Sequence, residues 1–201
     1  MAARRPPEND APEALALIEL SSIGRGARVV DAVAKKAPVT VHTAEPVSSG
    51  KYLLVFTGDV GSVEESFKEA VAVAGTTLVN KLLLWQVDPQ VVRVFQRRID
   101  VVDVDALAIV ESTSLATTIS AADAAVKAAE VTLIEIRLGH GIGGKGYFTL
   151  TGSQADLEAA VAAALAVCEQ ENSICGVEII NRPHQDLVDN LTRGAHRSRT
   201  G

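Results

Sequence analysis

The sequence has few aromatic residues, few cysteines and no excess of positive charge. Aromatic residues make up 3% of the 201 residues, which leaves few side chains that could stack on the bases of single-stranded nucleic acid. The net charge is -6, whereas a nucleic-acid-binding surface is usually basic. No apolar run reaches the roughly 18–20 residues of a membrane-spanning helix. These deficits argue against nucleic-acid binding and against a membrane location.

Two further deficits concern targeting and metal binding. The opening residues, MAARRPPENDAPE, contain two arginines but no apolar stretch after them, so they do not form a secretory signal. Their proline and charge predict a disordered segment over residues 1–13. Cys168 and Cys175 lack metal-ligand spacing and partner histidines. We expect two reduced thiols in a cytoplasmic protein and no metal site, with a reversible disulfide as the alternative.

The sequence does contain a long internal repeat. The segment ALALIELSSIGRGARVVDAVAKKAPVT at residues 14–40 is matched by ALAIVESTSLATTISAADAAVKAAEVT at residues 106–132, an offset of 92 residues. Further along, Gly50-Lys51 recurs as Gly144-Lys145, an offset of 94. The period exceeds that of solenoid repeats, and each copy has the size of a small domain. The repeat predicts two fused domains, at 14–98 and 106–192, a linker at 99–105 and a mobile basic tail at 193–201.

Hydrophobic periodicity predicts the same order of elements in both copies. In the first copy we expect strands at 15–20, 39–43, 52–56 and 78–87, and helices at 27–37, 60–74 and 89–98. In the second copy we expect strands at 106–111, 131–138, 146–151 and 176–181, and helices at 116–129, 154–169 and 184–192. This βαββαβ order predicts an α+β class, with two ferredoxin-like sandwiches whose helices cover one face of a mostly antiparallel sheet. That fold hosts many functions, so it does not fix the activity.

The glycine-rich stretch at 139–146, GHGIGGKG, is the most distinctive local feature. A phosphate-binding loop needs a helix after it, whereas here a strand follows, and the spacing differs from the nucleotide-binding patterns. The four histidines do not form a metal pair or a recognisable catalytic motif; they are His42, His140, His184 and His196. His140 could be a ligand or a pH-sensitive group, or simply an exposed loop residue. Glu19 and Glu111 end equivalent strands, and their repetition favours a structural contact over catalysis.

Several pieces together resemble the bacterial microcompartment shell domain. They are the strand ALALIE or ALAIVE, the helix end DAVAKKAPV or DAAVKAAEV, the small-residue loop before a strand that ends in Thr-Gly, and the closing IINRPHQDLV. The resemblance covers about residues 14–98 and 106–192. It implies a non-permuted strand order and the tandem arrangement of the shell proteins in which three two-domain chains form a pseudohexameric tile.

The resemblance also implies roles for particular residues. The loop before the third strand of each domain lines a central pore in that family; here this set comprises Val47, Ser48, Ser49, Gly141, Ile142 and Gly143, with His140 beside it. The tile edge is implied for Lys35, Lys127, Arg182 and His184. At an offset of 94 residues, Asp88 and Gln90 stand in the first copy where the second has Arg182 and His184. Some relatives bind an iron–sulfur cluster through a pore-loop cysteine, which neither loop here has, so we expect no cofactor.

The function that the resemblance implies is a non-enzymatic shell tile whose pore passes small polar metabolites. Its expected partners are its own copies in a homotrimer, other shell proteins (hexamers and pentamers) and encapsulated enzymes, at the shell of a compartment in the cytoplasm. One alternative is a trimeric cytosolic regulatory protein that binds a metabolite on a ferredoxin-like scaffold. A second alternative is an enzyme that uses the His140 loop, although the sequence offers no base with an orienting partner.

Overall fold

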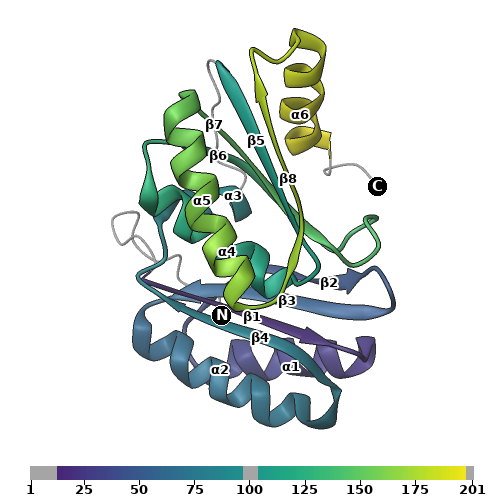
Figure 1. Cartoon of the computed structure of the whole chain (residues 1–201). Coiled ribbons are helices and arrows are strands. Elements are labelled where there is room, and N and C mark those ends of the chain that lie inside the picture. Colours follow the sequence, from purple (N-terminus) through teal and green to yellow (C-terminus); the bar gives the residue numbers. More distant parts are fainter. Residues whose placement is uncertain (1–12, 97–103, 198–201) are drawn as a thin grey trace.

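The computed structural model describes residues 13–96 and 104–197 and places them in two sheets with flanking helices (Figure 1). The first half contains β1 (Ala14–Leu20), α1 (Ile23–Lys36), β2 (Thr40–Val47), β3 (Lys51–Gly58), α2 (Val60–Ala74), the short 3-10 helix η1 (Gly75–Thr77), β4 (Leu78–Trp85) and α3 (Pro89–Phe95). The second half contains β5 (Ala106–Ser112), α4 (Leu115–Ala128), β6 (Thr132–Leu138), β7 (Gly146–Gly152), α5 (Gln154–Gln170), β8 (Ile174–Asn181) and α6 (Gln185–Arg197). The predicted order of strands and long helices is confirmed.

The two sheets have the same topology. Their strand orders are β2-β3-β1-β4 and β6-β7-β5-β8, and every neighbouring pair is antiparallel. This is the ferredoxin-like arrangement predicted from the βαββαβ order. Both sheets also have a bulge in matching places, between Val41 and Thr43 in β2 and between Leu133 and Glu135 in β6.

Helix α1 begins four residues earlier than predicted. Ser22 caps the helix by accepting a hydrogen bond from the Arg25 amide, so that the stretch with Gly24 and Gly26 is helical and is not a turn. The predicted cap of α2 is confirmed, because Asp59 accepts from the Ser62 amide. Ser153 likewise accepts from the Asp156 amide at the start of α5.

Three predicted irregular segments fall wholly or partly outside the described residues. Residues 1–12 of the predicted N-terminal segment and residues 97–103, which hold most of the predicted linker, are outside. A mobile tail was expected at 193–201, but helix α6 continues to Arg197. Only residues 198–201 lie outside the described residues. No proline stands between Thr192 and Arg197 to end the helix.

The structure corrects the alignment of the two closing segments. Trp85 pairs with Ala14 as Asn181 pairs with Ala106, so the offset here is 96 residues and not 94. Helix α5 has 17 residues against 15 in α2, and this insertion shifts the register. Arg182 therefore corresponds to Gln86, and both have positive φ, 49° and 53°. The counterpart of His184 is Asp88, and that of Gln90 is Asp186.

One helix–strand contact pairs a glycine with a larger residue in both domains, but the glycine is on the helix in the first domain and on the strand in the second. In the first domain Gly26 of α1 lies against Tyr52 of β3, and a Cβ on Gly26 would come within 2.2 Å of the Tyr52 ring. In the second domain Thr118 of α4 lies against Gly146 of β7, where an added Cβ would come within 2.2 Å of the Thr118 hydroxyl. Each domain thus needs one glycine in this contact, on opposite partners.

The two central strands of the first sheet, β1 and β3, are buried on both faces. One face packs on α1 and α2 through the alternate β1 residues Ala14, Ala16, Ile18 and Leu20. The other face carries Leu15, Leu17, Leu53 and Val55, which join the hydrophobic core of the second domain. All seven residues of β1 are therefore buried, in agreement with its unbroken apolar sequence.

Polar contacts also join the two domains. The Asn80 side-chain amide donates to the Ser114 hydroxyl at the start of α4, at 3.1 Å. The Asp88 backbone amide donates to the Asp123 carboxylate at 2.8 Å. Gln90 then donates to the Val131 carbonyl and accepts from the Leu133 amide, at 3.0 and 2.9 Å. Helix α3 is thus fixed to the edge strand of the second sheet.

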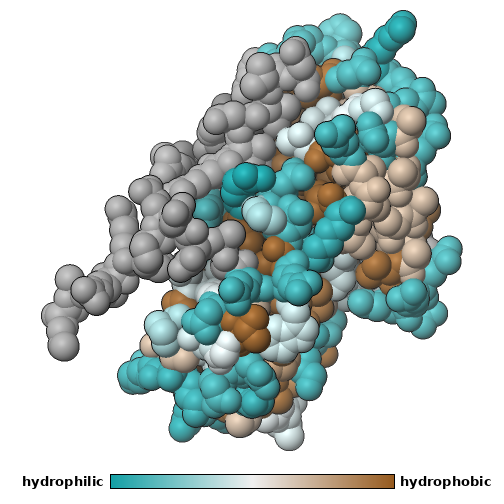
Figure 2. Space-filling model, turned by 90° about the vertical axis from the view of Figure 1, so that its left-hand side faces the viewer, coloured by the Kyte–Doolittle hydropathy of each residue, from teal (hydrophilic) through white to brown (hydrophobic). Residues whose placement is uncertain are grey.

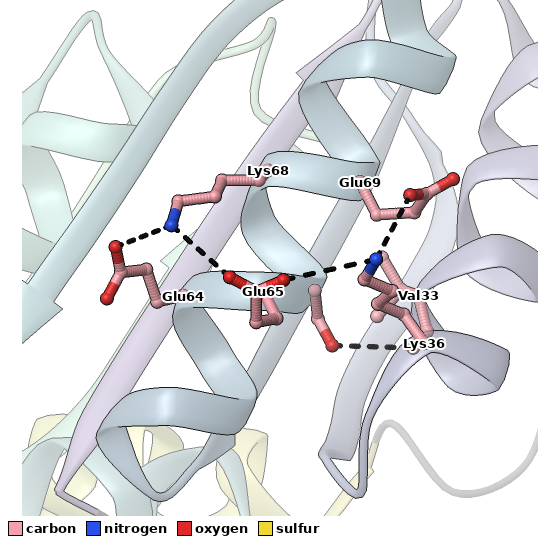
Figure 3. Close-up of polar contacts among 7 residues, drawn as sticks. Val33, Lys36, Glu64, Glu65, Lys68 and Glu69 are labelled. Carbon is pink, nitrogen blue, oxygen red and sulfur yellow. Dashed lines mark hydrogen bonds and ion pairs between the residues drawn. The ribbon is translucent and has the colours of Figure 1, made fainter.

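The helical faces of the two domains differ in charge. Figure 3 shows Lys36 of α1 reaching Glu65 and Glu69 of α2, and Lys68 reaching Glu64 and Glu65. Such exposed pairs contribute little to stability. In α5 the positions of Glu65, Lys68 and Glu69 are occupied by alanines, at residues 159, 162 and 163. The first domain therefore presents a charged helical face and the second an alanine-rich one.

His42 is another point at which the domains differ. It lies on β2 with Nε2 2.7 Å from the Thr57 hydroxyl, and its ring centroid is 6.2 Å from that of Phe95. Burial lowers the pKa of the His42 imidazole from 6.5 to about 4. The matching position in the second domain is Ile134, at the same bulge and 3% exposed.

We expect Gly146→Tyr to destabilise the second domain, because the new side chain overlaps Thr118. The expected loss is about 1–3 kcal/mol of unfolding free energy, measured by urea denaturation. Adding Thr118→Gly rebuilds the arrangement of the first domain, and we expect it to recover part of that loss although a helical glycine costs about 1 kcal/mol. If the losses of unfolding free energy from the two substitutions simply add, Thr118 and residue 146 do not share one space and the explanation is wrong.

We expect His42 to make the protein sensitive to acid. The unfolded imidazole binds its proton near pH 6.5 and the folded one only near pH 4, so lowering the pH through this window favours unfolding. His42→Ile, which copies the second domain, removes this contribution of at most about 3 kcal/mol. The measurement is urea denaturation of both proteins at about pH 7 and about pH 4.5. A stability difference that does not change with pH would contradict the assignment.

Candidate functional site

The two predicted pore loops lie against each other. The turn Ser48–Gly50 follows β2 in the first domain, and the glycine-rich loop from Gly139 to Lys145 follows β6 in the second. The Ser48 amide donates to the Gly139 carbonyl at 3.1 Å, and the Gly141 amide donates to the Ser48 hydroxyl at 3.0 Å. Loops that are equivalent in the repeat, and 93 residues apart, therefore form one continuous surface.

The glycine-rich loop is held in shape by its own backbone. The Gly139 amide donates to the Lys145 carbonyl at 2.9 Å, which closes the loop, and the Lys145 amide donates to the Ile142 carbonyl at 3.3 Å. Gly139 has φ +68°, and a Cβ there would come 3.1 Å from the Val47 side chain. The positive φ therefore favours glycine where the two loops meet, and the side chain of Val47 leaves little space for a larger residue.

The loop residues differ in their access to solvent. Ser49, His140, Gly141 and Gly143 are exposed, whereas Ser48 and Ile142 are partly exposed. Val47 was expected to line the pore, but its side chain is buried in the hydrophobic core beside Leu115. Val47 therefore supports the loop from below, and its side chain does not face an opening.

An ion pair lies at the base of each loop. Lys51 Nζ is 2.9 Å from Glu19 in the first domain, and Lys145 Nζ is 3.2 Å from Glu111 in the second. This confirms the interpretation of the two glutamates as a repeated structural contact. The lysine partners were not predicted, although the repeated Gly-Lys dipeptide was a signal for them. Each loop thus has a lysine whose charge is balanced by a carboxylate.

The two predicted edge lysines occupy the last turns of α1 and α4. Lys35 is 2.6 Å from Asp31, and Lys127 is 2.6 Å from Asp123, each pair being one helical turn apart. Both lysines are exposed, but Asp123 is buried because the Asp88 amide binds it from the neighbouring domain. A cation at this position also complements the helix dipole.

Arg182 and His184 lie on an exposed turn between β8 and α6. The Arg182 amide donates to the Asp105 carbonyl, and the His184 Nδ1 accepts from the Asp186 amide at 3.2 Å. Neither side chain is bonded to Lys35 or Lys127 among the interactions of the described residues. The structure of one chain therefore does not bring the predicted edge residues together.

The described residues give no catalytic or metal-binding constellation. Within 13–96 and 104–197, no three His, Cys, Asp or Glu side chains are grouped as metal ligands would be. Cys168 is buried in the core of the second domain. Among the same residues no helix is long and apolar enough to cross a membrane.

Comparison with known proteins gives one consistent answer. The BMC domain family matches residues 14–87 and again residues 106–183. The bacterial microcompartment shell protein PduT of Citrobacter freundii is 34% identical over 182 residues, which cover 90% of this chain and 99% of that protein.

Solved structures agree with the sequence comparison. A microcompartments protein from Desulfitobacterium hafniense DCB superimposes with a TM-score of 0.85 at 36% identity, over 89% of this chain and 99% of that one. The fused permuted hexameric shell protein of the RMM microcompartment gives a TM-score of 0.57 at 22% identity over 79% and 82% of the two chains, which supports the fold alone. The chain therefore belongs to the BMC-domain family and carries two such domains in tandem.

Proposed function

We propose that three copies of this shell protein join head to tail into a ring of six domains, a tile of the shell wall with a central channel for small polar metabolites. The role is structural and requires no catalytic group. Other shell proteins would surround the tile, and encapsulated enzymes would lie on its inner side. The proposal rests on family membership, on the unequal burial of matched flanks and on the contact between the two loops.

The observation that carries the proposal is the unequal burial of matched positions. Leu115 of α4 is 1% exposed, but its counterpart Ile23 of α1 is 48% exposed. The Asp123 side chain is 9% exposed against 62% for Asp31. On the opposite flank, the Glu19 side chain is 5% exposed against 45% for Glu111. One flank of each domain is thus covered inside the chain, and the matching flank of the other is open.

Open flanks of this kind suit a second copy of the chain. The open flank of the first domain matches the surface that α4 offers inside the chain, and the open flank of the second domain matches the outer face of the first sheet. Such a head-to-tail contact closes into a ring when the rotation between copies is right. Figure 2 shows hydrophobic areas among hydrophilic residues on one side of the single chain. Four large apolar side chains are exposed in total among the described residues: Ile23, Val60, Val79 and Trp85.

The adjoining loops are the natural lining of the channel. Two equivalent loops already meet within one chain, and continuing the same contact around a ring would bring six loops to its axis. Exposed backbone amides and the Ser49 hydroxyl can replace part of the hydration of a small polar solute. Because backbone amides are hydrogen-bond donors, we propose neutral or anionic metabolites as permeants. Lys51 and Lys145 add no net charge, since each is paired with a glutamate.

The ring is tested by its mass and symmetry. We expect sedimentation equilibrium to give three times the chain mass of 21.1 kDa. Electron microscopy of the same sample should place Ser49 and Gly141 nearest the threefold axis. A monomer, a dimer, or a trimer with both loops at its periphery would contradict the proposal.

The edge is tested separately from the ring. We propose that Lys35 and Lys127 lie at the rim of the tile, so that Lys35→Asp and Lys127→Asp should weaken lateral assembly into sheets while the trimer persists. Each reversal also places a carboxylate beside Asp31 or Asp123, at a cost of about 0.5 kcal/mol for the exposed pair. Negative-stain images and low-salt pelleting measure the sheets, with Lys68→Asp on α2 as the control. Unchanged sheets in the doubly substituted protein would rule out an edge role.

A further inference from the structure

We propose that the contact between copies is specified by an ion pair between Arg28 of one copy and Glu178 of the next, at the positions that Ser120 and Leu82 occupy in the contact inside the chain. This inference rests on the proposed ring and adds its pairing chemistry. The pair follows if the contact between copies has the same geometry as the contact between the two domains inside one chain.

The strand register shows which residue of the second sheet corresponds to Leu82 of the first. Leu17 of β1 pairs with Val55 and Leu82, and all three side chains lie on the sheet face that packs against the second domain. In the second sheet, Ile109 of β5 pairs with Thr149 and Glu178. Glu178 is therefore the counterpart of Leu82, on the sheet face that is left open for the next copy.

Helix periodicity shows which residue of α1 corresponds to Ser120 of α4. The stripe of α4 that is turned away from its own sheet holds Leu115, Ala116, Ile119, Ser120 and Asp123, and the last of these binds the Asp88 amide of the first domain. The matching stripe of α1 holds Ile23, Gly24, Ala27, Arg28 and Asp31, and every one of these is exposed. Arg28 is the counterpart of Ser120 and lies in the middle of this open stripe.

The path of β4 along α4 aligns these two positions. Asn80 binds Ser114 at the start of α4, and Asp88 binds Asp123 two and a half turns later. Leu82 and Leu84 lie between these two fixed points and pack into the shared core. By the same path, Glu178 of one copy would lie beside the first two turns of α1 in the next, within reach of the long Arg28 side chain.

The charges of the open surfaces are complementary. Arg28 and Glu178 are both exposed, and within residues 13–96 and 104–197 neither side chain forms a hydrogen bond or an ion pair. The adjacent Arg25 is already committed, since its guanidinium donates to the Val73 carbonyl of α2 at 3.4 Å. An exposed arginine and an exposed glutamate that meet on closure fix the register of the contact and exclude like-with-like pairing.

The test is a charge-swap cycle on the full chain. The proteins are the wild type, Arg28→Glu, Glu178→Arg and the double variant, each followed by sedimentation velocity over a dilution series. Each single reversal places like charges together, and we expect the trimer to dissociate at a concentration about tenfold higher. The double variant restores opposite charges, and we expect it to return to within about threefold of the wild type. Raising the salt concentration should reduce the difference between the proteins.

Two controls separate the pair from general effects of charge. Glu169→Arg makes the same change of charge at an exposed position of α5 and should leave the trimer unchanged. Arg28→Gln and Glu178→Gln remove the attraction without adding repulsion, and circular dichroism confirms that each variant is folded. If the double variant dissociates as readily as the worse single variant, the ion pair is overturned and the ring stands. If the wild type is not a trimer, the ring and the ion pair are both overturned.

Discussion

The packing of α4 between two sheets is the constraint on which the molecule depends. The helix covers its own sheet with one side and the outer face of the first sheet with the other, so ten of its 14 residues are buried. Without this helix the first sheet would expose Leu15, Leu17, Leu53 and Val55, a patch too apolar for a soluble surface. The first domain therefore depends on the second for one of its two hydrophobic layers.

The same dependence explains how two similar domains could diverge without losing their fold. Each substitution is tolerated where its neighbour changes with it, as in the exchange of Gly26 and Tyr52 for Thr118 and Gly146. The interior is close-packed, so such a contact has room for one large side chain only. Divergence without compensation is tolerated where side chains meet solvent, as on the helical face where the lysine and glutamates of α2 are alanines in α5.

The sequence predicted the fold well because most of its signals are local and the repeat presents them twice. Alternating apolar residues, capping residues and the long repeat located the strands and helices, and the family resemblance identified the loops. The register beyond α5 was wrong, because the sequence of an alanine-rich helix does not show that the helix is two residues longer than its counterpart. The burial of Val47 and the bonds of Gln90 to β6 could not be predicted either. Both depend on how the domains dock, which no local pattern encodes.

The difference between the covered and the open flanks has a physical reason. The contact inside the chain forms as the domains fold, because the linker holds the two surfaces at a high effective concentration. These surfaces can therefore be apolar, since they are exposed to water only briefly. The contact between copies must wait for another chain, and its surfaces meet water until then. A broad apolar surface in that position would associate with many partners, whereas Arg28 and Glu178 keep it soluble and selective. Fusion of two domains thus allows one contact to be built for stability and the other for specificity.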